Sequence, residues 1–241
     1  MKILSYLFSS LFGFLFFTIL LIFHPLQWIG LKIGYTAHKN VVDVLNWFLT
    51  KSLLVIGNAV FFKKNYSIPE NKTIIFVANH QSMFDIPPII WCLRKHHPKF
   101  VSKIELGKGI PSVSFNLKYG GAALINRKDS KQALRELERF GKQIHRNKWS
   151  AVIFPEGTRS RTGQPRKFSL NGLTMIVKYN PEALIVPISI NNSWKVYKYG
   201  NFPFGMWNKI TVESHQPIPL KNADLQTAFR TMESIIKKHV I

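Results

Sequence analysis

The segment NHQSMFD, residues 79–85, has the clearest potential for chemistry in this chain, because it places His80 five residues before Asp85. An imidazole can take a proton near neutral pH, and a carboxylate on its other ring nitrogen would fix the tautomer and stabilise the imidazolium. The pair therefore predicts a general base, His80, oriented by Asp85. The spacing also has a structural interpretation, since Ser82 and Asp85 fit a helix capping box.

An apolar strand is expected before each group of polar candidates. The run TIIFVA, residues 73–78, is short and β-branched, which predicts a buried strand that delivers His80 at its carboxyl end, where open α/β sheets bind ligands. The segment AVIFPEGTRSR, residues 151–161, has the same layout of strand, turn and polar groups, and this raises the His–Asp pair above a chance spacing. The polar candidates of this second segment are Glu156, Gly157, Thr158 and Arg159.

These two blocks resemble the motifs N-H-x-x-x-x-D and F-P-E-G-T-R-S of the lysophosphatidic acid acyltransferases, the 1-acyl-glycerol-3-phosphate acyltransferase family, and both are intact and in order. The stretch from Lys103 to Arg127 resembles the block between them that contributes to the glycerophosphate pocket, and residues 185–190, IVPISI, resemble the family's final strand. The chain departs from the family at residues 168–172, FSLNG, where F-K-x-G is usual; its version is one residue longer and lacks the lysine.

The resemblance implies transfer of a fatty acyl group from a thioester, acyl-CoA or acyl carrier protein, to the free hydroxyl of 1-acyl-glycerol-3-phosphate, forming phosphatidic acid in phospholipid biosynthesis. We expect direct transfer without an acyl-enzyme, because no serine or cysteine stands out as a base-activated nucleophile. The acceptor could instead be another lysophospholipid or a lyso-aminolipid. The alternative from another class is a non-catalytic protein with a basic, membrane-binding surface, against which the intact His80 and Asp85 argue.

The remaining candidates would bind the substrates. Arg159, with Arg127 as a second candidate, would hold the acceptor's phosphate through charge-assisted hydrogen bonds, and the resemblance assigns both positions to glycerophosphate binding. Glu156 and Gly157 would shape the pocket or bond the acceptor's hydroxyl. Lys103 and the backbone amides after the histidine are candidate donors to the oxyanion of the tetrahedral intermediate.

The composition indicates anionic partners. The chain of 241 residues has 33 Lys and Arg against 12 Asp and Glu, a formal net charge of +21, and 46% of its residues are hydrophobic. Nucleic acid is one class of partner that such a charge would fit, because basic surfaces with aromatic residues bind it. Anionic lipid head groups account for the charge and for an apolar N-terminal segment together. We therefore expect membrane lipids as partners and no nucleic acid.

The first part of the chain is apolar enough to be a membrane anchor. Residues 3–31 have no charged side chain other than a protonatable His24, and they could cross a hydrocarbon core of about 30 Å. The apolar run is too long for a signal peptide and no cleavage site follows, so we expect it to be retained. Residues 41–62 predict an amphipathic helix at the interface or packed on the first, with a core helix as the alternative. Lys63 and Lys64 favour a catalytic domain on the cytoplasmic side of an inner or cytoplasmic membrane.

Apolar strands and amphipathic helices alternate after Lys64. This alternation predicts a single α/β domain, residues 63–241, with a mixed, largely parallel sheet flanked by helices, after an anchoring unit of hydrophobic helices at residues 1–62. The family resemblance implies the same fold. Strands are expected near residues 73–78, 99–102, 122–125, 151–154, 184–190 and 209–213, and the clearest helices are expected at 130–148 and 223–240.

Metal and cofactor signals are missing from the sequence. Cys92 is the only cysteine, so no internal disulfide and no cysteine-based zinc site can form, and its apolar neighbours predict a buried, inert thiol. The eight histidines lack metal-ligand spacing, and His96 and His97 are expected at the surface or at a hinge. There is no glycine-rich nucleotide loop. We therefore expect no metal and no cofactor.

Overall fold

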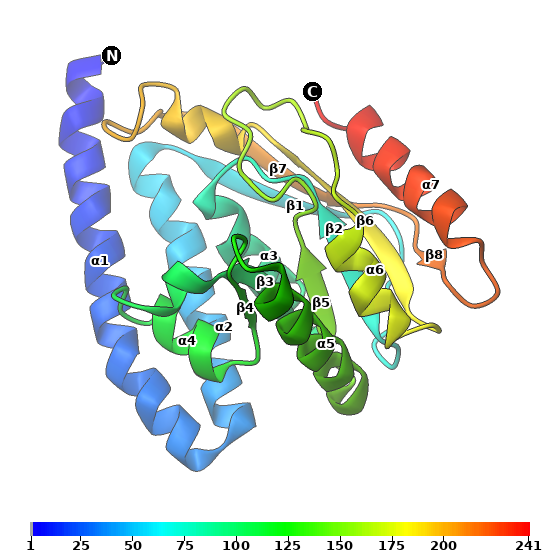
Figure 1. Ribbon diagram of the computed structural model, residues 1–241. Helices are drawn as coiled ribbons and strands as arrows, with labels where there is room; N and C mark the ends of the chain where they lie inside the picture. Colours follow the sequence, from blue (N-terminus) through cyan, green and yellow to red (C-terminus); the bar gives the residue numbers. More distant parts are fainter. Residues whose placement is uncertain (1) are drawn as a thin grey trace.

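A computed structural model describes residues 2–241 as one mixed sheet between layers of helices (Figure 1). Met1, the first residue of the expected anchoring unit, lies outside the described residues. The strands are β1 (Ala59–Lys64), β2 (Ile74–Ala78), β3 (Pro98–Lys103), β4 (Ala123–Ile125), β5 (Ser150–Ile153), β6 (Leu184–Asn191), β7 (Lys209–Ser214) and β8 (Ile218–Pro219). Their order is β1-β7-β6-β2-β5-β3-β4, with β8 beside β6.

The sheet is largely parallel, as predicted. Every neighbouring pair of strands is parallel except β6 with β7 and β6 with β8, which are antiparallel. All six expected strands are present, each within one or two residues of its predicted bounds. In a parallel array the carboxyl ends of the strands lie at one edge, and the ends of β2, β3, β4, β5 and β6 form what we call the carboxyl edge.

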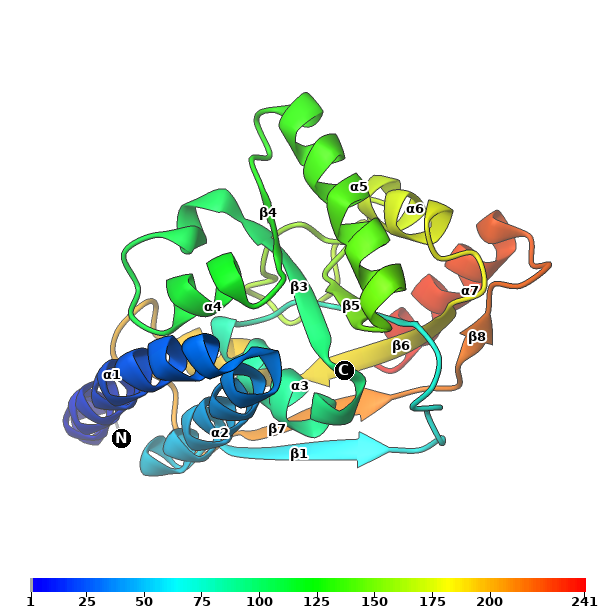
Figure 2. The ribbon, with the colours of Figure 1, turned by 90° about the horizontal axis from the view of Figure 1, so that it is seen from below.

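Helices cover both faces of the sheet, and Figure 2 shows the two groups on opposite sides of it. The helices are α1 (Lys2–Ile33), α2 (Tyr35–Ser52), α3 (Ile86–Cys92), α4 (Val113–Tyr119), α5 (Ser130–Asn147), α6 (Asn171–Lys178) and α7 (Leu225–Lys238). Strand β2 shows how both faces are used, since Ile75 and Val77 pack with α5, α6 and α7 while Phe76 and Ala78 pack with α2 and α3. Burial on both faces explains why this strand is apolar at every position.

The two clearest predicted helices are present and capped. Helix α5 agrees with the predicted range 130–148 to within one residue, and α7 lies inside the predicted range 223–240. The carboxylate of Asp129 accepts a hydrogen bond from the Gln132 amide at 3.0 Å, and that of Asp224 accepts one from the Thr227 amide at 2.9 Å. Both aspartates satisfy amides that the first helical turn leaves unpaired.

The helix predicted over residues 41–62 is wrong beyond Ser52. Helix α2 ends there, a 3-10 turn covers Leu53–Ile56, and Gly57 has a φ of 69° that an L-residue rarely adopts. The chain then enters β1, which pairs in parallel with β7 at the edge of the sheet. The sheet therefore begins before residue 63, where we expected the catalytic domain to start, and the division into residues 1–62 and 63–241 stays a prediction.

Candidate active site

The carboxyl edge brings together the ends of the strands that precede the predicted site residues (Figure 1). His80 follows β2 by two residues, and Glu156 opens the loop that follows the neighbouring strand β5. The further candidates are distributed along this edge: Gly157, Thr158 and Arg159 in the loop after β5, Lys103 at the end of β3, and Arg127 just after β4. The parallel order β2-β5-β3-β4 thus gathers the motifs on one side of the sheet.

The predicted contact between His80 and Asp85 is present. The Nδ1 atom of His80 lies 2.8 Å from Oδ2 of Asp85, whose side chain is fully buried. The same oxygen accepts hydrogen bonds from the backbone amides of Gln81 at 2.8 Å and Ser82 at 2.9 Å. The hydroxyl of Ser82 in turn accepts from the Phe84 amide at 3.0 Å, which completes the capping box. One carboxylate therefore makes both the capping contact and the contact with the His80 ring.

The imidazole of His80 has one nitrogen held and one available. Its ring stacks on Phe154, with centroids 4.1 Å apart and planes 15° apart, and the side chain is 15% exposed. Since Nδ1 is engaged by Asp85, Nε2 is the nitrogen that can exchange a proton with a substrate. The stacking fixes the plane of the ring, so the direction of Nε2 is set by the protein before a substrate binds.

Glu156 connects the two motifs through the backbone. One of its carboxylate oxygens accepts a hydrogen bond from the His80 amide at 2.7 Å, and the other accepts one from the Arg166 amide at 2.7 Å. The Ser160 amide also donates to the His80 carbonyl at 2.7 Å. Burial raises the pKa of Glu156, and the two amides oppose that shift. With both oxygens occupied, Glu156 fits the first of its two expected roles, shaping the pocket, better than bonding the acceptor.

Arg159 lies in an exposed loop, where an anion can reach its guanidinium. Gly157 turns the chain with a φ of 67°, and its amide donates to the Phe154 carbonyl at 3.0 Å. Thr158 and Arg159 follow at the surface, and the guanidinium carbon of Arg159 lies 5.9 Å from the centre of the Tyr197 ring. Within residues 2–241 Arg159 has no salt bridge to an acidic side chain. A guanidinium without a protein counter-ion is available for a phosphate.

Lys103 and Arg127 lie farther from His80 than Glu156 does. Lys103 pairs with Ile125 in the register of β3 and β4, two residues before Arg127, and both cations are exposed. Strands β3 and β4 are the second and third from β2, which at the usual strand spacing is about 10 and 14 Å across the sheet. Both residues therefore lie at the border of the candidate site.

Three further buried polar residues form part of this edge. The sequence did not predict a role for any of them. Asn79 joins β2 to β6, since its amide group donates to the Ile190 carbonyl at 2.9 Å and accepts from the Ile190 amide at 2.7 Å. Gln81 donates to the Gly163 carbonyl at 2.9 Å. Ser193 donates from its hydroxyl to Oδ1 of Asp85. The available signal was the end of the predicted strand 184–190, but the sequence did not show that this strand lies beside β2.

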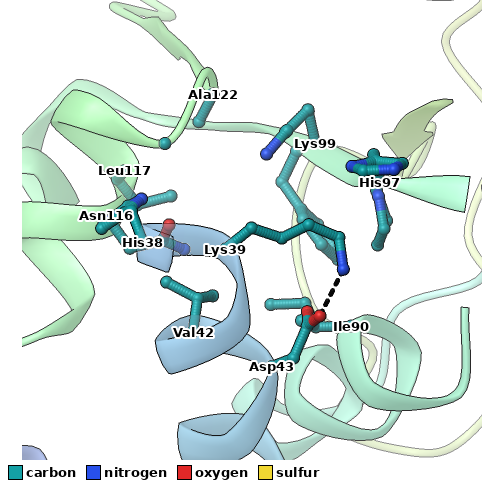
Figure 3. A pocket seen from close by; sticks show the side chains of 13 residues that line it. His38, Lys39, Val42, Asp43, Ile90, His97, Lys99, Asn116, Leu117 and Ala122 are labelled. Atoms are coloured by element: carbon teal, nitrogen blue, oxygen red, sulfur yellow. Dashed lines mark hydrogen bonds and ion pairs between the residues drawn. The ribbon is translucent and has the colours of Figure 1, made fainter. Parts of the chain in front are cut away.

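A second polar cluster lies at the opposite end of the strands. Figure 3 shows His38, Lys39 and Asp43 of α2 facing His97 and Lys99 across a small cavity, with an ion pair between Lys39 and Asp43. Because Lys99 pairs with the start of β5, the cluster lies away from the ends that carry the motifs. We call these five residues the amino-edge cluster.

Aromatic rings and burial shape the amino-edge cluster. The Lys99 amine lies 4.5 Å from the Trp149 ring centre and 4.9 Å from that of Tyr35, and burial lowers the pKa of Lys99 to about 8. The Tyr35 hydroxyl lies 2.8 Å from Nδ1 of His97. The neighbouring His96 is 5% exposed. The expectation of surface or hinge histidines here is therefore wrong for His96, which packs against Phe76.

Comparison with known proteins identifies the family. The sequence model described as Acyltransferase matches residues 59–191, more than half of the chain. The chain belongs to this acyltransferase family. The matched range begins with β1 and ends with β6, so the acyltransferase match includes both motif blocks and the strands that position them.

Curated relatives and a solved structure agree with this family. The chain is 28% identical over 183 residues to the chloroplastic 1-acyl-sn-glycerol-3-phosphate acyltransferase LPAT1 of Arabidopsis thaliana, covering 74% of this chain and 50% of the relative. It is 35% identical over 133 residues to the 1-acyl-sn-glycerol-3-phosphate acyltransferase of Helicobacter pylori, covering 52% and 54%. The chain thus spans about half the length of the curated relatives it matches.

The fold is that of a solved acyltransferase. The crystal structure of the 1-acyl-sn-glycerophosphate (LPA) acyltransferase PlsC from Thermotoga maritima has a TM-score of 0.80 to this chain at 24% identity. The match covers 98% of this chain and 95% of that one. It therefore includes α1 and α2 as well as the sheet, so the whole architecture described above is shared.

Proposed function

We propose that this acyltransferase moves a fatty acyl group from an acyl thioester to the free hydroxyl of 1-acyl-glycerol-3-phosphate, forming phosphatidic acid. The observation that carries the proposal is the contact between His80 and the buried Asp85 at the carboxyl edge, together with Arg159, which lies in the loop after β5 and has no salt bridge among the described residues. A base and a phosphate-binding cation at one edge are what an acceptor with a hydroxyl and a phosphate requires. The matched relatives are named as 1-acyl-sn-glycerol-3-phosphate acyltransferases, which supports this choice of acceptor.

The proposed chemistry starts with proton transfer to His80. Nε2 takes the proton of the acceptor hydroxyl as its oxygen attacks the thioester carbonyl carbon, and the carbonyl oxygen becomes the oxyanion of a tetrahedral intermediate. The C–S bond then breaks, and the leaving thiolate takes the proton from the imidazolium. Asp85 stabilises the imidazolium in between and keeps the tautomer that presents Nε2. Transfer is direct, so no covalent acyl-enzyme forms.

Substrate binding is assigned to the cations of the carboxyl edge. Arg159 holds the phosphate of the acceptor, and Arg127 adds a second positive charge from beyond β4. Lys103 is the remaining candidate donor to the oxyanion, because the amides of Gln81 and Ser82 that follow His80 already donate to Asp85. Acyl-CoA and acyl carrier protein are both polyanionic donors, and a chain with a net charge of +21 attracts either one.

We further propose that the protein works on a membrane, with the catalytic domain on the cytoplasmic side. Residues Ile3–Ile33 of α1 form the one helix of the described residues long and apolar enough to cross a bilayer, with a mean hydropathy of 2.3. The helix also packs along the domain, because Ser9 accepts a hydrogen bond from the Phe204 amide and His24 accepts one from the Ser112 amide. Its outward face is apolar: Ile3, Leu7, Leu11, Phe14, Phe17, Leu21, Ile22, Trp28, Ile29 and Ile33 are exposed.

The contacts of α1 favour a helix that lies in the membrane interface. A helix fixed at both ends to an α/β domain could cross the hydrocarbon core only by drawing charged loops into it, which is costly. The exposed apolar face should hold the protein on vesicles even at high salt, because salt screens charge attraction without weakening apolar burial. Co-sedimentation with anionic vesicles at low and high salt measures this. Release of the full-length protein by salt alone would contradict it.

An activity assay tests the proposed reaction. Purified full-length protein in detergent is offered a panel of lysolipid acceptors with acyl-CoA or acyl carrier protein as donor, and products are identified by mass spectrometry. We expect phosphatidic acid, and a fall of at least about 10²-fold in turnover for His80→Ala, the usual size of a general base contribution. His145→Ala, on the exposed face of α5, is the matched control and should be unaffected.

Three results would each contradict a part of the proposal. A wild-type protein that acylates none of the acceptors would contradict the function and favour a binding protein. Acylation of a different lysolipid would keep the chemistry but replace the acceptor. A folded His80→Ala variant with near-normal turnover would contradict the mechanism alone.

A further inference from the structure

Ser193 lies under the histidine–aspartate pair although it belongs to a distant part of the chain. It begins the 3-10 turn Ser193–Tyr197 just after β6, and its side chain is fully buried. Asn192 before it has a φ of 67°, a left-handed conformation that asparagine tolerates better than most residues. Since β6 is the parallel neighbour of β2, this turn places Ser193 beside the segment that follows β2.

The hydroxyl of Ser193 completes the hydrogen bonding of Asp85. The Asp85 Oδ2 atom already accepts from His80 and from two backbone amides, whereas Oδ1 accepts from the Ser193 hydroxyl. A serine has a single proton to donate, and the alternative acceptor, Oε1 of Gln81, lies 3.5 Å away. The charged carboxylate is the stronger acceptor, so the proton belongs to the bond with Asp85.

A separate contact holds Ser193 in place. Its backbone amide donates to Oε1 of Gln81 at 3.1 Å, and Gln81 donates from its other side-chain atom to the Gly163 carbonyl at 2.9 Å. The serine is therefore fixed between Asp85 and a glutamine that also holds the loop after β5. This arrangement orients the hydroxyl independently of its bond to the carboxylate.

We propose that Ser193 is a positioning residue for the proposed acyl transfer, acting through Asp85 on His80. Its hydrogen bond keeps the carboxylate plane aligned so that Oδ2 stays on Nδ1 of the imidazole. It also draws negative charge toward Oδ1, which limits how tightly Asp85 holds the imidazolium. The imidazolium must give its proton to the leaving thiolate in every cycle, so both effects favour turnover.

The inference rests on the proposed function. Its test must also take account of the other charged and titratable groups near His80 and Asp85. Glu156 and Arg159 face the pair from the loop after β5, and Tyr197 faces it from the same turn as Ser193. Neither Glu156 nor Arg159 is hydrogen-bonded to Ser193 in the described structure. A change confined to the Ser193 hydroxyl therefore alters the pair while these neighbours keep their own contacts.

The test is Ser193→Ala, with Ser193→Thr as the variant that restores a hydroxyl. We expect kcat to fall about tenfold in Ser193→Ala while KM for both substrates changes by less than about twofold. The acidic limb of the pH–rate profile should move to higher pH, because an Asp85 without its Oδ1 partner stabilises the imidazolium more. Ser193→Thr should recover most of kcat and the original limb.

A matched control removes a buried hydroxyl from β6, the strand that ends just before Ser193. Ser189 bonds the Nε2 atom of His215 at 2.8 Å and is fully buried, but it does not contact Asp85 or His80. Ser189→Ala should lose stability as Ser193→Ala does, without moving the pH–rate profile. An equal movement of the profile in both variants would overturn the proposal, as would an unchanged profile and kcat in Ser193→Ala.

A readout without turnover separates this proposal from the function. NMR of histidine-labelled protein follows the titration of the His80 ring, assigned by its loss in His80→Ala, in wild type and variants. If the wild type acylates no acceptor, the proposed function fails, yet a shift of the His80 titration to higher pH in Ser193→Ala still supports the link to Asp85. If Ser193→Ala does not fold, Ser193→Cys, with its weak donor, should give an intermediate shift, and no shift would overturn the link.

Discussion

Asp85 and Asp43 are both buried carboxylates near histidines, one at the carboxyl edge and the other in the amino-edge cluster. Asp85 accepts hydrogen bonds from two side chains and two backbone amides, which fixes both of its oxygens. Asp43 forms an ion pair with the flexible Lys39, and burial raises its pKa. Nearby, Nε2 of the buried His38 has no hydrogen-bond partner within residues 2–241.

This difference in hydrogen bonding distinguishes the candidate active site at the carboxyl edge from the buried polar contacts of the amino-edge cluster. Backbone amides are held by the fold, so the carboxylate they bind cannot rotate, and a histidine on that carboxylate has one orientation. A carboxylate paired with a lysine side chain can move with it. The amino-edge cluster therefore joins α2 to β3, whereas the carboxyl edge holds an imidazole in one orientation, as the proposed proton transfer requires.

Replacing each aspartate by asparagine should show the largest contrast. Asp85→Asn should lower turnover by at least about 10²-fold, because an amide favours the wrong imidazole tautomer and cannot stabilise the imidazolium. Asp43→Asn should change turnover by less than about threefold in the folded protein. Steady-state acyl transfer by both purified variants measures this. Similar losses in the two would break the distinction between the edges.

Replacing one cation at each edge should give a smaller difference between the two edges, and this difference should be in KM. Arg159→Ala should raise KM for a phosphate-bearing acceptor about tenfold or more, since a lost charge-assisted contact is worth about 1.5–3 kcal/mol, while KM for the thioester changes little. Lys99→Met should leave both KM values near their normal levels. Arg161→Ala, in the same loop as Arg159, is the local control. Equal effects of Arg159→Ala on both substrates would place this arginine in the fold or at the donor site.

The smallest expected effect is on stability in acid. Burial lowers the pKa of His97 to about 4 from 6.5, so the unfolded chain takes a proton in this range and the folded chain does not. The contribution of His97 to the free energy of unfolding is complete above pH 6.5 and is lost as pH falls from 6.5 to 4.

Denaturant unfolding between pH 4 and 8 checks this expectation. As pH falls from 6.5 to 4, the free energy of unfolding should decrease less steeply for His97→Gln than for the wild type. The amide of this variant cannot titrate but can still meet the Tyr35 hydroxyl. An identical slope in the two proteins would exclude His97 as a source of the acid sensitivity.

The sequence predicted the elements whose signal is local. Strand β2 is apolar at every position because both of its faces are covered, and the contact of His80 with Asp85 depends on a single short turn. The error after Ser52 has a local cause as well: residues 53–62 are apolar at spacings that fit a short helix or a strand, and the break depends on the backbone of Gly57.

The partners that the sequence did not reveal are set by tertiary structure. Ser193 meets Asp85 only because β6 lies beside β2, and a strand order cannot be deduced from apolar runs. His96 is buried and packs against Phe76 of β2, which its position next to another histidine and a proline did not suggest. Residue type and spacing predicted the contact between His80 and Asp85, and the packing of distant strands decided which other groups hold it.

The hydrogen bonds that hold His80 and Asp85 have a consequence for how the protein folds during its synthesis. The bond from the His80 amide joins residues 76 positions apart in the chain, and the bond from Ser193 to Asp85 joins residues 108 positions apart. Contacts this distant form late in folding, because the intervening chain must first be closed into a loop. A nascent chain on the ribosome would contain His80 and Asp85 long before it could orient them. The proposed acyl transfer would therefore reach its full rate only after residue 193, in the last third of the chain, has been synthesised and β6 has packed beside β2.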